Sequence, residues 1–493
     1  MKLKVKFLDW SAGIPVAMLN EHTALSLGVH AKERVSIQKT VNGHKEFSTI
    51  VDLSDKLVKK NELFVSEEIQ KLLNLKKGEI VEVVLAPMPQ SLAFIKKKVL
   101  NRTLSKKEIF EIIHDITANS LSEAEIALFV SGVYESGMNF KETIHLIEAI
   151  VHEGKTLDFG ENMVVDKHSI GGVAGNRTTP IVVSICAAAG LIFPKTSSRA
   201  ITSAAGTADI IETLARVDFS LPELKKIVHS TNACMVWGGA LNLAPADDKL
   251  IQVEKALGLD PEAQLLASIM AKKISVGSTH ILIDIPCGEF AKVSREKALG
   301  LKKKFEKIGK YFKKKLICVI TDGNHPIGRG VGPVLEMNDV LSVLKSDPDC
   351  PKDLKEKGIF LAGKILELTD RSKKDQGEIL ARRILDSGLA FEKFKEIITA
   401  QKGKIKNLGQ AKYKKDVTAK KSGKITKMKN KDINSLGRIL GSPLDKRAGV
   451  YLHKNFGDLI KKREVLMTFY SESLPRINQA IAFFNSQDIV KIE

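Results

Sequence analysis

The sequence predicts a multidomain α/β protein with an N-terminal β-rich module, a small all-α domain, a large α/β domain with a mainly parallel central sheet, and a C-terminal α+β module. Three observations support this prediction. The chain has 493 residues, too many for one ordinary core. The spacing of apolar residues changes several times along the chain. Two successive strand–loop–helix units begin near residue 163, which is typical of a parallel sheet.

The first 88 residues read as short strands and turns, with helical pieces near 66–74. A Pro-containing stretch, APMPQ, then separates this module from a helical domain over 91–160 that is completed by about 247–275. Three helices are expected in it, because each segment starts with a Ser or Asn cap candidate and carries apolar residues three and four apart. The three segments are 105–119, 122–137 and 139–154.

The α/β domain is expected over 161–246 and 276–408. Its first unit has a strand at 163–166, a loop, and a helix capped by Thr179, with Pro180 in the first position and Gly190 at the end. The second unit repeats this order, with a strand at 191–193, a loop, and a helix capped by Thr207. Further strands are predicted at 279–286 and 315–322.

The last segment, 409–493, forms the C-terminal α+β module. Its short apolar runs are separated by Gly and Asn-Lys turns, which indicates strands. The runs lie at 417–433, 449–455 and 464–473.

The formal net charge of +19 admits either a nucleic-acid partner or a field that attracts phosphorylated small molecules. The lysines are spread widely and lie opposite apolar positions, as in 297–315, and aromatic residues make up only 5% of the chain. We therefore interpret the charge as a lysine-rich surface and expect no nucleic-acid partner. An RNA-binding protein remains the alternative from a different functional class.

Five scattered cysteines form no Cys-x-x-Cys pair and have no His-rich surroundings, so we expect no metal site and a reducing cytoplasm. The N-terminal residues alternate lysine with apolar residues and lack the apolar core of a signal peptide. The longest apolar stretch, 181–193, is too short to span a bilayer. No membrane association is expected.

The two loops of the α/β domain carry the candidate chemistry. Each loop joins the end of a strand to a helix N-terminus, where free N–H groups bind anions. Either loop alone could be an ordinary turn before a helix cap, whereas two such loops with a basic residue in each favour a phosphate site. The first contains Lys167, Ser169 and His168, a candidate catalytic or substrate-contacting residue. The second contains Ser197, Ser198, Arg199, Thr202 and Ser203, and Arg199 could hold a phosphate through two parallel bonds.

A third region, 259–273, leaves two readings open. Asp260 precedes Pro261, which fits a helix cap followed by a first-position proline. Ser268 and Lys272 are four residues apart and share a helix face. That face could present a hydrogen-bonding pair to a ligand or could be an ordinary solvated face.

These stretches resemble the thymidine phosphorylase family of nucleoside phosphorylases. The resemblance covers about residue 91 to the end, and rests on DKHSIGGV, SIMAKK, VITDGNHPIGRGVG and the C-terminal AGVYLHKNFGD. It is closer still to the archaeal-type AMP phosphorylases, which have an N-terminal module of this size and similar versions of both loops. This resemblance implies that phosphate cleaves a nucleoside 5′-monophosphate, AMP and also CMP and UMP, into a free base and ribose 1,5-bisphosphate. It implies no cofactor, and a homodimer or larger homo-oligomer.

The resemblance also implies roles for individual residues. Asp260 matches the proton donor, and Lys272 matches a lysine on the base side. Inorganic phosphate is expected at Lys167, Ser169, Thr179, Ser197 and Thr207. The nucleotide is expected at Gly172, Ser198, Arg199, Ala200, Ile201, Thr202, Ser203, Thr207, Ser268 and Lys292.

Departures from the plain nucleoside enzymes favour a second phosphate. Ser198 replaces a glycine of their second loop, while Thr202 and Ser203 add hydroxyls. Their pyrimidine-contacting arginine has no counterpart in 251–264. A thymidine or pyrimidine nucleoside phosphorylase is the nearest alternative. A phosphoribosyltransferase is more distant, because its glycine-rich signature is absent.

Overall fold

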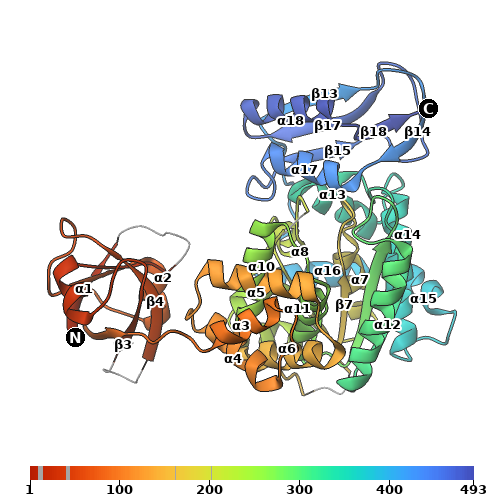
Figure 1. The fold of residues 1–493 in the computed structure, drawn as a ribbon. Coiled ribbons are helices and arrows are strands. Elements are labelled where there is room, and N and C mark those ends of the chain that lie inside the picture. The colour runs from red at the N-terminus through yellow and green to blue at the C-terminus, as the bar shows by residue number, and fades with distance from the viewer. Residues whose placement is uncertain (9–14, 40–44, 161–162, 201–202) are drawn as a thin grey trace. The chain divides into compact units, whose positions relative to one another are not determined.

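A computed structural model describes residues 1–8, 15–39, 45–160, 163–200 and 203–493 of the chain (Figure 1). They form two compact units, one of Met1–Glu153 with Pro245–Ser268 and the other of Gly154–Ala244 with Ile269–Glu493. The predicted class is confirmed, because a β-rich module, a helical bundle, a parallel α/β sheet and a C-terminal α+β module follow one another along the chain.

The N-terminal module is a closed six-stranded barrel in the order β1-β5-β2-β4-β3-β6. In β1, Leu3 and Val5 are buried while Lys2 and Lys4 are exposed, so the alternation noted in the sequence becomes the two faces of a barrel strand. The elements are β1 (Lys2–Phe7), β2 (Ala17–Leu19), α1 (Glu21–Leu27), β3 (Arg34–Lys39), β4 (Lys45–Leu53), β5 (Glu62–Val65), α2 (Glu67–Leu73) and β6 (Ile80–Leu85).

The helical part of the first unit begins its helices where the cap residues predict. Ser105 and Ser122 both form capping boxes, with Glu108 and Glu125 respectively. Asn139 Oδ1 accepts the Glu142 N–H at 3.0 Å, as expected of the third cap. The helices are α3 (Ser91–Val99), α4 (Lys106–Thr117), α5 (Glu123–Ser136), α6 (Phe140–Glu153), α10 (Pro245–Leu257) and α11 (Glu262–Ser275), of which the residues from Ile269 on belong to the second unit.

The α/β domain contains the parallel sheet that the sequence predicts. β7 (Val165–Ser169), β10 (His280–Cys287) and β11 (Lys315–Asp322) are parallel in the order β11-β10-β7. A second parallel pair, β8 (Phe193–Ser197) and β9 (Ala233–Trp237), meets the β7 side through a bridge between Val164 and Ile192. Every residue of β10 is buried, as expected of a central parallel strand.

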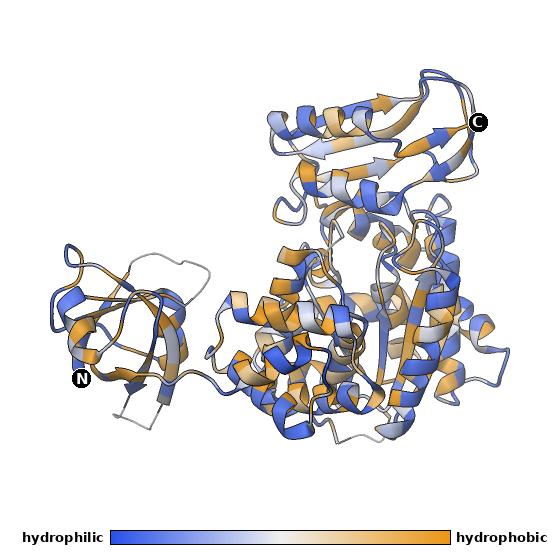
Figure 2. Cartoon of the chain, viewed as in Figure 1, coloured by the Kyte–Doolittle hydropathy of each residue, from blue (hydrophilic) through white to orange (hydrophobic). Residues whose placement is uncertain are grey.

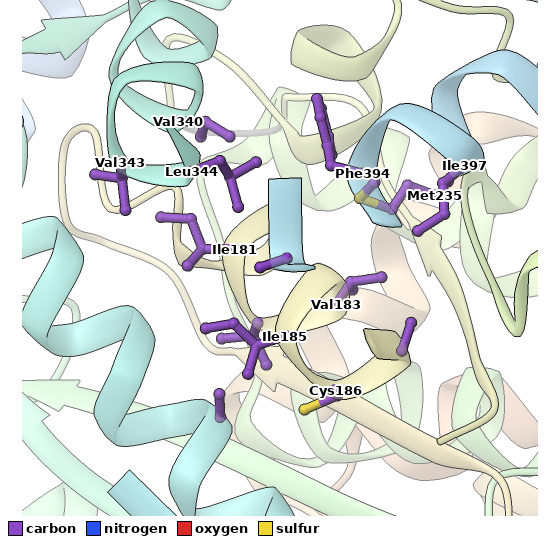
Figure 3. Close-up of a cluster of buried hydrophobic side chains, with 14 of the residues drawn as sticks. Ile181, Val183, Ile185, Cys186, Met235, Val340, Val343, Leu344, Phe394 and Ile397 are labelled. Carbon is purple, nitrogen blue, oxygen red and sulfur yellow. The ribbon is translucent and has the colours of Figure 1, made fainter. Parts of the chain in front are cut away.

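The helices of this domain surround α7 and build its core. In α7 (Thr178–Ala188), each residue from Thr178 to Ala187 is buried. Figure 3 shows its side chains among those of β9, α13 and α16. The remaining elements are α8 (Thr207–Ile211), α9 (Leu221–Thr231), the short 3₁₀ helix Gly238–Leu241, α12 (Arg295–Tyr311), β12 (Gly330–Val331), α13 (Pro333–Leu344), α14 (Lys352–Leu368), α15 (Gly377–Asp386) and α16 (Leu389–Ala400).

The C-terminal module shares both a core cluster and a sheet with the α/β domain. The strand β12 pairs with β15, so the four-stranded sheet has the order β12-β15-β17-β13. A second sheet has the order β16-β14-β18. The elements are β13 (Tyr413–Thr418), β14 (Gly423–Met428), α17 (Asn430–Leu440), β15 (Gly449–Leu452), β16 (Leu459–Ile460), β17 (Val465–Ser471), α18 (Leu474–Ser486) and β18 (Val490–Ile492).

The helix α12 shows where the positive charge lies. Ala298, Leu301 and Phe305 are buried, while most of its lysines are exposed. Hydrophilic and hydrophobic residues alternate along the ribbon of this helix in Figure 2. This distribution agrees with a lysine-rich surface. In the described part of the chain, no helix has both the length and the apolar character needed to cross a membrane.

Two strands extend further than the sequence predicts. β7 continues through Lys167, His168 and Ser169, which were expected in a loop, and β8 continues to Ser197. The reason is pairing with a distant strand, since β10 matches β7 residue by residue up to Asp284 opposite Ser169.

Both predicted helix caps are wrong by one or two residues. α7 begins at Thr178 with Arg177 in the cap position, so Thr179 lies inside the first turn. α8 begins at Thr207 itself and is capped by Gly206, whose N–H is bound by the Asp209 carboxylate at 2.8 Å. Both threonine hydroxyls therefore remain available for other contacts.

Candidate active site

The end of β7 brings Lys167 to the first turn of α7. The Lys167 Nζ donates to the Thr178 Oγ1 at 2.8 Å and to the Thr179 Oγ1 at 3.4 Å. Since side chains alternate along a strand, Ser169 lies on the same face as Lys167. An ammonium group, three hydroxyls and a helix N-terminus therefore meet at one sheet edge, an arrangement suited to an anion.

Buried hydroxyls at the ends of β7 and β8 make no hydrogen bond with any described residue. They are the Ser169 Oγ, the Thr196 Oγ1 and the Ser197 Oγ. Leaving a buried polar group unpaired costs about 1–3 kcal/mol, so such groups indicate a ligand or solvent. Thr196 was not singled out from the sequence, although it lies in the same Lys-Thr-Ser-Ser run as Ser197.

Two buried lysines, Lys195 and Lys273, lie beside Asp166. Asp166 accepts a hydrogen bond from Lys273 at 2.6 Å and lies 3.6 Å from the Lys195 ammonium. Burial lowers the pKa of Lys195 to about 7, with a further contribution from the charge of Lys273. Two lysines therefore share one carboxylate, and Lys195 is charged in only part of the molecules at pH 7.

A second buried carboxylate, Asp284, pairs with one lysine. It accepts a hydrogen bond from Thr321 at 2.6 Å and pairs with the buried Lys357 at 3.4 Å. Burial lowers the pKa of Lys167 to about 8, and Asp284 opposes that shift. A bound anion would stabilise the charged forms of these lysines, because the two aspartates alone do not balance their positive charge.

His168 is surrounded by positive charge. Burial holds its pKa well below the usual value, and Lys273, Lys195 and Lys272 lower it further. The imidazole is therefore neutral at pH 7.

Two acidic residues, Asp209 of α8 and Glu212 at its end, hold Arg199 of the second loop in place. Its guanidinium makes two bonds of 2.7 Å to Glu212 and one of 3.2 Å to Asp209, and lies over Trp237 at 4.9 Å. The two parallel bonds that were expected for a phosphate go to Glu212 in this structure.

The neighbouring residues of the second loop are arranged around it. The Ala200 N–H donates to the Asp209 carboxylate at 2.7 Å, and the Ser203 Oγ donates to the Ala205 carbonyl at 2.8 Å. Ser198 is exposed. Ile201 and Thr202 lie outside the described residues.

Arg177 joins the two loops. Its Nη2 donates to the Ala205 carbonyl at 2.7 Å, its Nη1 to the Thr207 Oγ1 at 3.4 Å, and its Nε to Glu336 at 2.6 Å. The loops that the sequence predicts to act together are thus in direct contact.

Gly172 and Lys292, both expected at the nucleotide, lie side by side. Gly172 has φ +90°, and a Cβ on it would lie 2.8 Å from the Lys292 Cβ. Glycine is required here for both its backbone conformation and its lack of a side chain.

Asp260 and Ser268 belong to the first unit. Asp260 is exposed and stands two residues before α11 begins at Glu262, so Pro261 and not Asp260 directly precedes the helix. The Ser268 Oγ donates to the Asp247 carboxylate at 2.9 Å. Lys272 belongs to the second unit, among the charges that act on His168. Over the described ranges, no group of three or more His, Cys, Asp or Glu residues could hold a metal ion.

Three family models match segments of the chain. They are the glycosyl transferase family helical bundle domain over 92–154, the glycosyl transferase family a/b domain over 161–271, and the pyrimidine nucleoside phosphorylase C-terminal domain over 424–487.

Whole-length relatives decide the family. The AMP phosphorylase of Methanococcus aeolicus is 40% identical over 496 residues, which cover 100% of this chain and 97% of the relative. The AMP phosphorylase of Thermococcus kodakarensis is 42% identical over 498 residues, covering 100% and 98%. The chain belongs to the AMP phosphorylase family. It is therefore an enzyme of the glycosyltransferase class, a pentosyltransferase.

The fold extends beyond this family. The anthranilate phosphoribosyltransferase of Thermus thermophilus superposes with a TM-score of 0.52 at 18% identity, covering 63% of this chain and 99% of that enzyme. At this identity the likeness concerns the fold alone.

Several residues at the site were not identified from the sequence. Arg177 and Thr178 stand in the family stretch KHSIGGVAGNRTTP, and so their positions could have been marked. Lys273 is adjacent to Lys272 in SIMAKK, but only burial distinguishes the two. Lys357 has no local signal, because it reaches Asp284 from a helix more than seventy residues later.

Proposed function

We propose that this member of the AMP phosphorylase family catalyses phosphorolysis of nucleoside 5′-monophosphates. Its reaction is AMP plus phosphate giving adenine and α-D-ribose 1,5-bisphosphate, with CMP and UMP as further substrates. Whole-length relatives that carry the AMP phosphorylase name support this assignment. The observation that carries it is a set of buried hydroxyls with no hydrogen-bond partner among the described residues, at the ends of β7 and β8, the strands that also carry Lys167 and Lys195.

Two loops in contact suit two phosphates. In this proposal inorganic phosphate binds where Lys167 and the first turn of α7 meet the ends of β7 and β8. Its contacts are Lys167, Ser169, Thr179, Ser197 and Thr207. The nucleotide, with its own 5′-phosphate, contacts Gly172, the run from Ser198 to Ser203, Thr207, Ser268 and Lys292.

The reaction moves electrons from phosphate to the base. A phosphate oxygen forms a bond to C1′ of the ribose, while the bond from C1′ to the base nitrogen breaks and its electron pair stays on the base. The sugar passes through an oxocarbenium-like state, and the departing base gains negative charge. Phosphate is already anionic at neutral pH, so Lys167 and the hydroxyls position it and need not activate it.

Asp260 is the proposed proton donor to the departing base. It must be protonated when the bond breaks, and burial against the base would favour that form. Lys272 is proposed on the base side, and neutral His168 as a hydrogen-bonding contact for the substrate.

The cellular setting is also a proposal. All five cysteines are free and buried, which fits the reducing cytoplasm. We expect the enzyme to act as a homodimer or larger homo-oligomer in nucleotide salvage.

The direct test incubates the protein with phosphate and, separately, AMP, CMP, UMP, adenosine or thymidine, and follows release of free base. We expect turnover of the monophosphates. Turnover of the nucleosides alone would instead support a pyrimidine nucleoside phosphorylase, and salt-dependent RNA binding without base release would support an RNA-binding protein. Replacing Asp260 with Asn should abolish most adenine release, and near-normal release would remove it as the donor.

A further inference from the structure

One helix of the C-terminal module contacts both substrate loops. Asn430 and Asn434 are four residues apart on α17 and therefore share one face (α17 in Figure 1). The Asn430 Oδ1 accepts the Ala174 N–H of the first loop at 3.0 Å. The Asn434 Oδ1 accepts the Ala204 N–H of the second loop at 3.1 Å.

Asn430 also reaches the segment that carries Lys292. Its Nδ2 donates to the Gly323 carbonyl at 2.8 Å and to the Phe290 carbonyl at 3.4 Å. The side chain is fully buried, so these bonds are not shared with solvent. Asn430 thus joins the first loop to the end of β11 and to the backbone two residues before Lys292.

The packing around these bonds is close. Ala174 and Ala204 are buried in the same apolar cluster as Ile433 and Leu436 of α17. A Cβ on Gly437, one turn after Asn434, would lie 2.7 Å from the Ala204 Cβ. The helix backbone is therefore in direct contact with the second loop, and a small shift of α17 would move that loop.

We propose that Asn430 and Asn434 are positioning residues that hold the two loops in their binding geometry, an inference that rests on the proposed use of these loops. Asn434 positions the part of the second loop next to Ser203, which is assigned to the nucleotide. Asn430 positions the phosphate loop together with the Lys292 segment.

The two residues differ in what their loss exposes. Without Asn434, the Ala204 N–H loses its acceptor, beside residues assigned to the nucleotide. Without Asn430, the Ala174 N–H and two carbonyls lose their partner, and these groups adjoin residues assigned to both substrates. An unpaired buried amide is costly, so the local backbone is expected to rearrange. Selective loss of nucleotide binding in one variant and combined loss in the other therefore distinguishes positioning from general stabilisation.

The test compares Asn434→Ala, Asn430→Ala and the control Ser435→Ala in the full chain. Ser435 lies on the same helix, and its hydroxyl donates to the Lys431 carbonyl within that helix. AMP and inorganic phosphate are titrated separately by calorimetry, KM and kcat are measured for both, and the thermal midpoint is recorded. If Asn434→Ala does not fold, Asn434→Ser provides a milder change, with a hydroxyl that water can bridge to the Ala204 N–H.

We expect Asn434→Ala to weaken AMP binding by roughly tenfold and phosphate binding by less than about twofold. Asn430→Ala should weaken both by roughly tenfold, and Ser435→Ala neither. Lower thermal midpoints with unchanged affinities, or equal loss of both ligands in Asn434→Ala, would overturn the inference. If the unaltered protein binds both ligands and the variants lose affinity as expected, but no base is released, the proposed function fails and the positioning role stands.

Discussion

At the residue scale, the unpaired hydroxyls distinguish binding from stability. Ser169 has a buried Oγ without a hydrogen-bond partner among the described residues, so removing it breaks no bond within the fold. We expect Ser169→Ala to raise the phosphate KM by roughly tenfold without lowering the thermal midpoint.

The matched control is Ser471→Ala. The Ser471 Oγ is buried, donates to the Leu440 carbonyl at 2.6 Å and accepts the Ser473 N–H at 3.2 Å, so its loss takes a partner from both groups. This variant should lose about 1 kcal/mol of stability and keep the phosphate KM. Destabilisation by Ser169→Ala with an unchanged phosphate KM would contradict the assigned role of Ser169.

Lys167 predicts a pH dependence at the same scale. Burial lowers its pKa from 10.5 to about 8, Lys357 and Arg177 lower it further, and Asp284 and Asp166 oppose the shift. Phosphate binding uses the charged form, so affinity should fall as pH rises through about 8. Between about 8 and 10.5 the unfolded chain holds a proton at Lys167 that the ligand-free fold does not, so this residue stabilises the fold increasingly as pH rises.

Calorimetric titrations of phosphate, made about every half pH unit between about 6.5 and 9.5, measure the affinity. Thermal midpoints of the ligand-free protein measure the opposite trend. In Lys167→Met, the phosphate affinity should no longer fall as pH rises through about 8. A phosphate affinity that stays constant across the range would show that the charge of Lys167 does not bind the anion.

At the element scale, the first loop depends on a close approach of two backbones. Gly175 has φ +68°, and a Cβ on it would lie 2.1 Å from the Ile327 carbonyl oxygen. Gly171 has φ +87° with open space around it and serves as the control for backbone strain alone. Gly175→Ala should cost about 1–3 kcal/mol more than Gly171→Ala in denaturant unfolding, because a steric clash adds to the strain. Equal losses would show that the contact with Ile327 is not limiting.

Local signals predicted the elements whose ends are set locally. The capping boxes at Ser105 and Ser122 fix the starts of α4 and α5 within four residues of sequence. The ends of β7 and β8 could not be predicted in this way, since their pairing partners are distant strands. α7 starts before the predicted cap Thr179, because Thr178 is already helical. α8 starts at the predicted cap Thr207 itself, because the Asp209 carboxylate caps the helix through the Gly206 N–H.

The candidate site follows the same division. Lys167, Ser169 and Ser197 could be predicted, because motif and chain order place them at strand ends before helices. The pairing of Lys273 with Asp166 and of Lys357 with Asp284 depends on tertiary contacts across many residues. The bidentate pairing of Arg199 with Glu212 could not be read from the sequence, where the same arginine suggested a bond to phosphate.

At the scale of the whole molecule, charge and family membership agree on the kind of substrate. A net charge of +19, with many lysines exposed on surfaces such as α12, raises the local concentration of anions. Relatives of nearly the same length are matched along the entire chain. We conclude that this enzyme transfers the ribose 5-phosphate of AMP to inorganic phosphate.

Phosphorus NMR of the reaction with AMP and phosphate, alongside quantification of adenine, tests this conclusion. We predict that each adenine released consumes one inorganic phosphate and gives one sugar carrying two phosphates, the original one at C5 and a new one at C1. Adenine release without consumption of phosphate, which would indicate hydrolysis, would contradict the account. So would conversion of adenosine, but not AMP, into a sugar with a single phosphate.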